Sequence, residues 1–464
     1  MDDMTLPDSS NGSETPERKR ERRKATRAAT IGSVLEYYDF ALFGAAAATV
    51  FPHVFFPNSS PVLASFQSIA VFSLGFIIRP VAGWVLGSLG DRFGRSRILL
   101  ATLMIMGCGT VLIGLLPSFG SIGVAAPILL MVLRLFQGVG AAGEFNGAVV
   151  VAMEFAPKSR RGLFGAFPAV GPPLGSAIGA LVMLAASAVV TGEQFLSWGW
   201  RIPFLLGGLL ALYAFYLRRQ LPETPEFSKT NGKGQTSRSP LRDALRSRPR
   251  VLVTMLLSFF ALGGHSYVYA TFGTSFAGRT VQLGSSALFI GIIVGYVAQA
   301  AFVPIFGWLS DIVGRRAVVG GGFLLLIVMV FPYFALIRPN WPLGLWIGIF
   351  ATNGIGLAAV FAPITTYLAE MLPPTYRFSG IALGRESGVA LGSAIIPPLA
   401  VLLTADGSTT ALSILLIGLS VLGIGGMLAI PRILRREAGD DAEAIPAQVS
   451  AAGTPVTSLV ADRT

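Results

Sequence analysis

The sequence predicts an all-α membrane protein with twelve transmembrane helices in two pseudo-symmetric six-helix bundles. Three observations support this fold class: the composition, the number and length of the apolar runs, and an internal repeat. Of the 464 residues, 53% are hydrophobic and 13% are charged, whereas a soluble domain has about 25% charged residues. A single cysteine and two histidines exclude a disulfide scaffold and argue against a Cys/His metal site. We therefore expect no metal and no cofactor.

Twelve apolar runs are long enough to cross the hydrocarbon core of a bilayer, which takes about 20 residues of helix. Runs of this length predict helices, because the strands of a barrel would be shorter and would alternate apolar with polar residues. The predicted spans cover residues 29–50, 62–88, 97–117, 122–152, 162–190, 198–219, 250–275, 285–309, 317–337, 342–370, 378–403 and 410–433.

The 35 lysines and arginines fall mostly on one side of these spans, in both tails, in the central loop and in alternate short loops. The opposite loops hold Arg201, Arg279 and Arg338. By the positive-inside rule this asymmetry predicts that both termini are cytoplasmic. The net charge of +11 is therefore a topology signal, and it does not require nucleic acid as a partner.

The spans divide into two sets of six on either side of a loop rich in Pro, Gly, Ser and basic residues. The N-terminal segment is too charged for a standard signal peptide, so we expect the first span to be retained. A short amphipathic helix is expected near LRDALRSR in the central loop. The predicted domains are a cytoplasmic basic N-tail (1–28), the first bundle (29–219), the central cytoplasmic loop (220–249), the second bundle (250–433) and a disordered cytoplasmic C-tail (434–464).

Three blocks of the first half recur at equivalent places in the second half. The repeats lie six spans apart, which keeps the same orientation in the membrane and predicts parallel repeats with a substrate site at mid-depth between them. The matched pairs are GSLGDRFGRSR (87–97) with GWLSDIVGRRA (307–317), EFAPKSRR (154–161) with EMLPPTYR (370–377), and LGSAI at 174–178 with LGSAI at 391–395.

These blocks and several others are similar to those of a known family. The chain resembles the major facilitator superfamily over all twelve spans, and more narrowly its metabolite:proton symporter branch. The resemblance implies proton-driven transport of a small acid or zwitterion, such as shikimate, 2-oxoglutarate, citrate, betaine or proline, across a bacterial inner membrane. It also implies a monomer whose partners are the substrate, protons and the lipid bilayer. The blocks that carry it are EYYDFALFG (36–44), GFIIRPVAGWVLGSLGDRFGR (75–95), RLFQGVGAAGE (134–144), EFAPKSRRG (154–162), WGWRIPFLLG (198–207) and LPETPEF (221–227).

The charged residues of the repeated loops are candidates for a gate. Asp91 is placed to accept from backbone amides at a nearby helix N-terminus, and the arginines can pair with Glu154 across the cytoplasmic face. Contacts that exist in only one arrangement of the bundles would bias which side is open; the alternative is a simple topological anchor of positive charge. The gating candidates are Asp91, Arg92, Arg95, Glu154, Arg161, Asp311, Arg315, Glu370 and Arg377.

Charges inside the spans cost at least about 2.5–3.5 kcal/mol each at the bilayer centre, so each needs a reason. Proton coupling needs a group that alternates between neutral and charged forms, and carboxylates in a low-dielectric cavity suit this task. The candidates are, in order, Asp39, Glu144, Glu36 and Glu386. For Glu36 and Glu144 a structural ion pair with Arg79 or Arg134 stays open. His265 is either a relay or a packing residue.

Arginines stay charged when buried and bind carboxylates through two parallel hydrogen bonds. Arg134, Gln137 and Glu144 fall on one face of span 4, which predicts the wall of a polar cavity. Members of the branch usually have an aromatic-polar pair where this chain has Arg385-Glu386, so this pair is either a substrate handle or a local ion pair. The substrate-binding candidates are Arg134, Arg385, Arg79, Gln137, Tyr38 and Tyr267.

Other functions are compatible with the same pattern. A proton-coupled drug or metabolite exporter of the same superfamily would share the loop motif, and a facilitator or solute sensor would share the fold without proton coupling. An enzyme is not expected, because the sequence shows no nucleophile–base–orienter set, metal cluster or glycine-rich phosphate loop.

Overall fold

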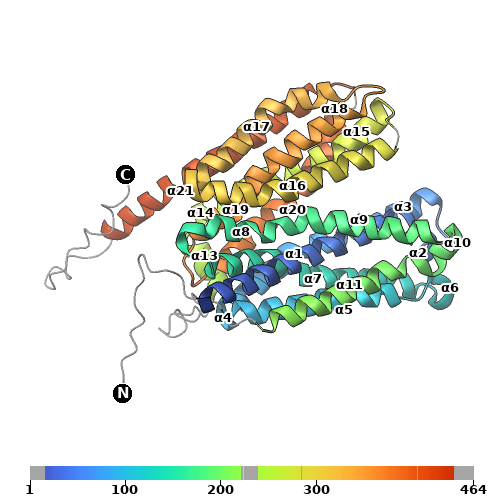
Figure 1. The fold of residues 1–464 in the computed structure, drawn as a ribbon, viewed down its shortest axis with the longest axis horizontal. Coiled ribbons are helices and arrows are strands. Elements are labelled where there is room, and N and C mark those ends of the chain that lie inside the picture. Colours follow the sequence, from blue (N-terminus) through green and yellow to red (C-terminus); the bar gives the residue numbers. More distant parts are fainter. Residues whose placement is uncertain (1–15, 221–222, 224–238, 284, 405, 444–464) are drawn as a thin grey trace, which may run out of the picture.

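The computed structural model describes residues 16–220, 223, 239–283, 285–404 and 406–443. Within these ranges the chain forms helices joined by short connections and has no strand. The helices gather into two groups, one above the other in Figure 1, and run between the end that carries the termini and the opposite end. We call these the terminal end and the distal end.

The first bundle is built from the N-terminal half of the chain. Its connections include α2 (Phe51–Phe55), α6 (Phe119–Ile122) and α10 (Gly192–Gln194). Its spans are α1 (Pro16–Thr49), α3 (Pro61–Ile77) continued by α4 (Arg79–Phe93), α5 (Arg95–Leu115), α7 (Ala125–Glu154), α8 (Arg161–Ala166) continued by η2 (Pro168–Val170) and α9 (Gly171–Val189), and α11 (Arg201–Arg218).

The second bundle follows the short helix α13 (Pro240–Ser247), which lies at the place where LRDALRSR predicts an amphipathic helix. Its spans are α14 (Pro249–Tyr267) continued by η4 (Val268–Phe272) and α15 (Gly273–Thr280), α16 (Ser285–Val313), α17 (Arg315–Leu336), α18 (Pro342–Ile349) continued by η5 (Phe350–Leu357) and α19 (Ala358–Glu370), α20 (Arg377–Leu403), and α21 (Thr410–Glu443).

Among the described residues, 10 helices are long and apolar enough to cross a membrane. The other two predicted spans, 29–50 and 250–275, lie in α1 and in α14 with its continuation. α1 packs against α7 and α9, and α14 packs against α20 and α21, so both helices belong to the bundles. The predicted fold class, twelve helices in two bundles, is therefore confirmed.

Two helices extend beyond the predicted limits of the bundles. α1 begins at Pro16, inside the predicted N-tail, because Ala25, Ala28 and Ala29 are buried and give its first turns a packed face. α21 continues to Glu443, so residues 434–443 are helical where the sequence predicts disorder; alanine, arginine and glutamate favour continued helix there. The rest of the two predicted tails lies outside the described residues.

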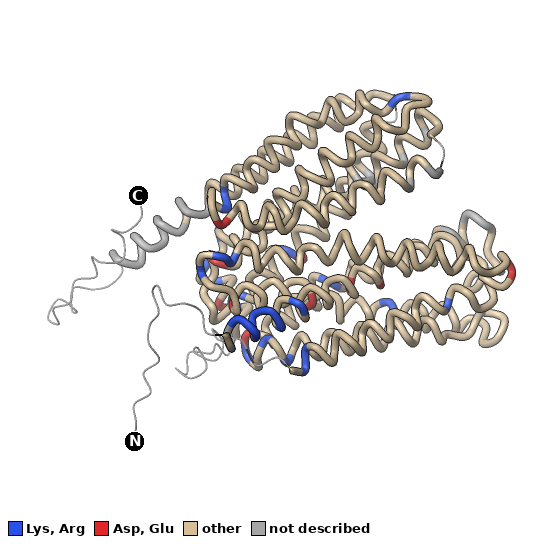
Figure 2. The backbone as a smooth tube through the Cα atoms, viewed as in Figure 1, with Lys and Arg blue, Asp and Glu red and all other residues tan. Residues whose placement is uncertain are grey.

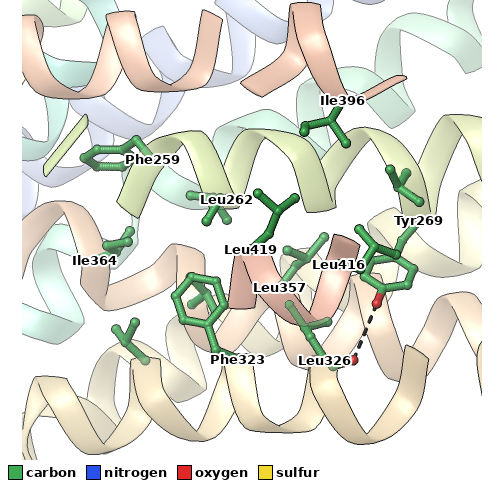
Figure 3. Close-up of a cluster of buried hydrophobic side chains, with 14 of the residues drawn as sticks. Phe259, Leu262, Tyr269, Phe323, Leu326, Leu357, Ile364, Ile396, Leu416 and Leu419 are labelled. Carbon is green, nitrogen blue, oxygen red and sulfur yellow. Dashed lines mark hydrogen bonds between the residues drawn. The ribbon is translucent and has the colours of Figure 1, made fainter. Parts of the chain in front are cut away.

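Each bundle has a core of its own, and Figure 3 shows part of the one in the second bundle. Phe259 and Leu262 of α14 pack with Phe323 of α17 and Leu419 of α21. Lipid is as apolar as these side chains, so close packing, rather than escape from water, holds such helices together. The core of the first bundle is a separate cluster that includes Leu35, Phe43 and Trp200.

The bundles contact each other chiefly through two equivalent helix pairs. α4 of the first bundle packs against α20 of the second, and α16 of the second packs against α8 and α9 of the first. Towards the distal end the two groups of helices diverge (Figure 1). The bundles are thus closed on each other at the terminal end.

The two copies of the repeated loop have the same backbone geometry at one glycine. Gly94 ends α4 and Gly314 ends α16, and both have positive φ, 110° and 94°. These values lie in a region that is nearly restricted to glycine. Each glycine lets one long helix stop and the next begin at once in a new direction. The two halves therefore share this corner as well as its sequence.

We expect Gly314→Ala to lower the free energy of unfolding by about 1–3 kcal/mol, because a Cβ strains this backbone conformation. Gly320→Ala, in α17, is the matched control: a Cβ there meets nothing within 4 Å, and alanine favours the helix. Thermal unfolding of the detergent-solubilised protein measures both. Equal stability of the two variants would show that the corner is not strained.

Candidate functional site

Charged residues gather at the terminal end of the bundles, and few lie along the spans (Figure 2). At this end Asp91, in the last turn of α4, accepts hydrogen bonds from the backbone amides of Phe378 and Ser379, at 3.2 and 2.8 Å, and from the Ser379 hydroxyl at 2.9 Å. These amides belong to the first turn of α20, where a helix presents unpaired donors and a positive partial charge. A carboxylate of the first bundle thus caps a helix of the second.

The second copy of the motif makes the reciprocal contact. Asp311, near the end of α16, accepts from the backbone amides of Gly162 and Leu163, each at 2.8 Å. These amides open α8 of the first bundle. Each bundle therefore caps one helix of the other, as the parallel repeat requires.

Arginines and glutamates add ion pairs to the first of these caps. Glu154 accepts from Arg95 of its own bundle and from Arg377 of the second bundle, the latter at 2.8 Å. Arg95 also donates to the Pro374 carbonyl across the interface at 2.7 Å. All three charged side chains are buried, so these contacts are little screened by water.

The second copy is arranged similarly but within one bundle. Arg315 donates to both carboxylate oxygens of Glu370 at 2.8 Å and to Asp311 at 2.8 Å. Arg161 opens α8 at the place equivalent to Arg377. Arg92 is exposed at this end. Its guanidinium carbon lies 5.0 Å from the ring centroid of Phe93, in a cation–π contact.

Glu223 is a further charged residue of the terminal end, and the sequence analysis did not single it out as a gating candidate. Its carboxylate accepts from the backbone amides of Arg95 and Ser96, at 3.0 and 3.1 Å, which are the first amides of α5. The LPETPEF block, placed directly after the first bundle, was the available signal. Glu223 therefore adds one more acid to the charged residues at the terminal end.

A second group of charges is buried where α4 and α7 meet α20. Arg79 pairs with Glu36 of α1 and lies 3.6 Å from Glu386 of the second bundle. Arg385 donates to Glu386 at 2.5 Å. Asn146 of α7, which sequence reasoning missed, donates to Glu386 at 2.9 Å. We call these five residues the interface cluster.

Arg134 lies in an aromatic surround within the first bundle. Its guanidinium carbon is 4.8, 4.2 and 4.9 Å from the ring centroids of Phe40, Phe43 and Phe72. It donates to the Gln137 side chain at 2.6 Å and to the Phe72 carbonyl at 3.2 Å. One terminal nitrogen of this guanidinium is buried without a hydrogen bond in the described part of the chain.

Asp39 points towards the same neighbourhood from α1. It accepts from the Thr110 hydroxyl at 2.5 Å, and Gln137 donates to that hydroxyl at 2.9 Å. Asp39 and Arg134 are therefore linked through two polar side chains of α5 and α7.

Glu144 does not share a cavity wall with Arg134. Arg218, at the end of α11, donates to both of its carboxylate oxygens, one of them at 2.8 Å, and Thr102 lies 3.5 Å away. The ion pair with Arg79 or Arg134 that the sequence left open for Glu144 is therefore wrong, because the partner of Glu144 is Arg218, the last residue of α11. Both partners are buried inside the first bundle.

The two tyrosines named as ligands differ in placement. Tyr38 donates to the Pro203 carbonyl of α11 at 2.8 Å and is buried in the first bundle, away from the interface cluster. Tyr267 is the last residue of α14 in the second bundle and is half-buried. His265 bonds to the Ala261 carbonyl at 2.8 Å and to the Ser420 hydroxyl at 2.9 Å, which fits packing rather than a relay.

Two repeated six-helix bundles, closed on each other at one end and sharing buried arginine–carboxylate pairs at their contact, define a membrane transporter of the alternating-access class. Residues 25–252 match the family described as "Sugar (and other) transporter", and residues 280–461 match "Major Facilitator Superfamily". The chain belongs to the major facilitator superfamily. It is a transporter and not an enzyme.

Relatives and a solved structure agree with this assignment. The inner membrane metabolite transport protein YhjE of Escherichia coli is 34% identical over 427 residues, which cover 90% of this chain and 94% of that protein. The shikimate transporter of the same organism is 34% identical over 81% of this chain and 86% of its own length. The proton:xylose symporter XylE has the same fold, with a TM-score of 0.70 at 16% identity over 89% of this chain and 96% of that chain.

Proposed function

We propose that the protein is a proton-coupled symporter that imports a small organic acid or zwitterionic metabolite across a bacterial inner membrane by alternating access. The interface cluster is the observation that carries this proposal. It places two arginines and two carboxylates, all buried, at the contact between the two bundles. The similarity to the shikimate transporter of Escherichia coli supports an organic acid as the substrate.

Arginine in a buried site is suited to hold a carboxylate, because its charge persists and its donors match the two oxygens. Arg79 and Arg385 come from different bundles, so a carboxylate bound between them would contact both moving parts. The carboxylates beside them can accept protons. These residues thus offer both functions that a symporter of acids needs.

The basic residues of the terminal end support a cytoplasmic location for both termini. In that orientation the structure is closed towards the cytoplasm. The contacts of Asp91, Asp311 and Glu154 between the bundles exist only in this closed arrangement, so they stabilise it relative to the one that is open to the cytoplasm. Substrate and proton binding would shift this equilibrium.

The test is uptake into proteoliposomes with shikimate, 2-oxoglutarate, citrate, proline and glycine betaine, with and without an inward proton gradient. We expect at least one compound with a carboxylate to accumulate above its external concentration, and a protonophore to abolish the accumulation. Flux that only equilibrates the compound would indicate a facilitator, and active extrusion would indicate an exporter. No flux of any of the compounds would contradict transport of acids.

A further inference from the structure

We propose that Glu386 occupies the position of the substrate carboxylate in the empty transporter. A substrate carboxylate takes over its arginines, and the displaced Glu386 takes up one proton. This inference rests on the proposed function. It adds that Glu386 couples transport to the proton, that Glu386 mimics the carboxylate of the substrate, and that one proton is carried. One proton is carried for each carboxylate bound.

The contacts of Glu386 are those expected of a bound carboxylate. One oxygen accepts from Arg385 at 2.5 Å and from Asn146 at 2.9 Å, and the other lies 3.6 Å from Nε of Arg79. The side chain is 5% exposed. Its partners come from α4, α7 and α20, so the carboxylate connects the two bundles as a ligand between them would.

The arginines retain donors for an incoming anion. Nε of Arg385 is buried and makes no hydrogen bond within the described part of the chain, and Nε of Arg79 has the 3.6 Å ion pair with Glu386 but no hydrogen bond there. A buried donor without a hydrogen bond is costly, so an acceptor that reaches these atoms is favoured. A substrate carboxylate can therefore begin to bind before Glu386 has left.

Charge balance sets the number of protons. The interface cluster holds two positive groups, Arg79 and Arg385, and two negative groups, Glu36 and Glu386. A third carboxylate would leave an uncompensated negative charge in a buried site, which is strongly unfavourable. Protonation of Glu386 removes that charge and restores neutrality.

The other buried acids are less suited to this exchange. Glu36 pairs with Arg79 inside the first bundle, Glu144 is held by Arg218, and Asp39 is bonded to Thr110. None of these contacts crosses to the second bundle. Of the four proton-coupling candidates, Glu386 is the one whose described contacts join the two bundles, to Asn146 and Arg79 of the first, so its release also removes an attraction between them.

The surroundings of Glu386 contain few other groups that titrate. Tyr37 of α1 lies near Arg385 and Glu386, and Arg79 faces Glu386 from α4. α7 contributes neutral Asn146 and the ring of Phe145, 4.0 Å from the Arg385 guanidinium carbon. α14, which covers the other side of this part of α20, contributes apolar residues such as Met255 beside Gly384 and, further along, Tyr267.

One transport cycle moves one proton and one substrate molecule. On the open side, water supplies a proton that forms an O–H bond on Glu386, while the substrate carboxylate pairs with Arg79 and Arg385. After the bundles reorient, the substrate leaves, Glu386 returns its proton to water on the other side and pairs with the arginines again. A monocarboxylate with one proton carries no net charge, whereas a zwitterion with one proton carries +1.

The experiment uses shikimate, a monocarboxylate, and glycine betaine, a zwitterion, with the full-length protein in proteoliposomes at a clamped membrane potential. For the wild type, we expect a pH gradient to drive shikimate accumulation, and 100 mV of potential to change it less than about twofold. The same potential should change glycine betaine accumulation by about 50-fold if that compound is carried with one proton. Shikimate uptake that follows the potential overturns the one-proton exchange.

Glu386→Gln tests the residue itself. We expect this variant to keep exchange of labelled for unlabelled shikimate across the membrane but to lose accumulation driven by the pH gradient. Glu193→Gln, an exposed acid to amide change near the distal end, is the control and should still accumulate shikimate. Accumulation that survives in Glu386→Gln, or that is lost equally in Glu193→Gln, overturns the assignment of Glu386.

Failure of the proposed function and failure of the Glu386 exchange give different results. A wild type that carries neither probe and none of the other acids and zwitterions of the uptake panel contradicts the proposed function and the exchange together. A wild type that accumulates shikimate, with a Glu386→Gln variant that does so equally well, contradicts the exchange alone. The measurement of potential on the wild type stands even if Glu386→Gln does not fold.

Discussion

Arg218→Met is expected to lower the free energy of unfolding by about 3–5 kcal/mol, because it leaves the Glu144 carboxylate buried without its cation. The Glu144 side chain is fully buried, and Arg218 donates to both of its oxygens. Methionine preserves most of the volume of the arginine stem, so the loss reports the charge and not a cavity. Thermal unfolding in detergent, together with the yield of folded protein, measures the effect.

The double variant Glu144→Gln, Arg218→Met tests whether the lost stability comes from the unpaired charge of Glu144. Removing both charges should recover most of the lost stability, since replacing a complete buried pair by neutral groups is often nearly neutral. Arg219→Met is the matched control one residue along, where the side chain is exposed, and should change stability by less than about 0.5 kcal/mol. A double variant as unstable as Arg218→Met alone would contradict the ion-pair explanation.

Glu154→Gln is expected to open the terminal end. The Glu154 carboxylate holds Arg95 of one bundle and Arg377 of the other, and a hydrogen bond between charged groups contributes about 1.5–3 kcal/mol. Loss of the contact between bundles should therefore raise the population of the state open at this end by at least about tenfold. The reporter is a cysteine at Ser310, which is 1% exposed where α16 meets α8.

The reporter is introduced as Ser310→Cys in a Cys108→Ser background, which removes the single natural cysteine. The rate of reaction with N-ethylmaleimide then measures opening, and it should rise in Glu154→Gln. Glu193→Gln, an exposed acid near the distal end, is the control and should leave the rate unchanged. An unchanged rate in Glu154→Gln would show that this carboxylate does not hold the bundles together.

The spans and the repeat could be predicted because they depend on patterns along the chain. Length and apolarity define a membrane helix, and the copy of GSLGDRFGR in the second half requires equivalent corners at Gly94 and Gly314. The same repeat also allowed the capping contact of Asp91 to be expected. These features need no knowledge of which helices are neighbours.

The partners of the buried charges could not be predicted in the same way. Arg134 and Glu144 are ten residues apart, which at about 100° per residue places them about 80° apart around α7. This difference places Arg134 among three phenylalanine side chains and Glu144 against α11, where it pairs with Arg218. Which arginine pairs with which acid depends on how neighbouring helices are rotated, and the apolar pattern of a membrane span constrains that rotation weakly.

Under the proposed proton exchange, the contact between Arg79 and Glu386 would also affect how well the protein conserves the proton gradient. A proton that arrived on Glu386 without substrate would leave Arg79 and Arg385 to share the single charge of Glu36, with one buried cation uncompensated. Under this exchange the protonated but empty carrier would be a rare species, and it would carry few protons across on its own. The same ion pair that waits for a carboxylate would thus limit leakage of protons through the unloaded transporter.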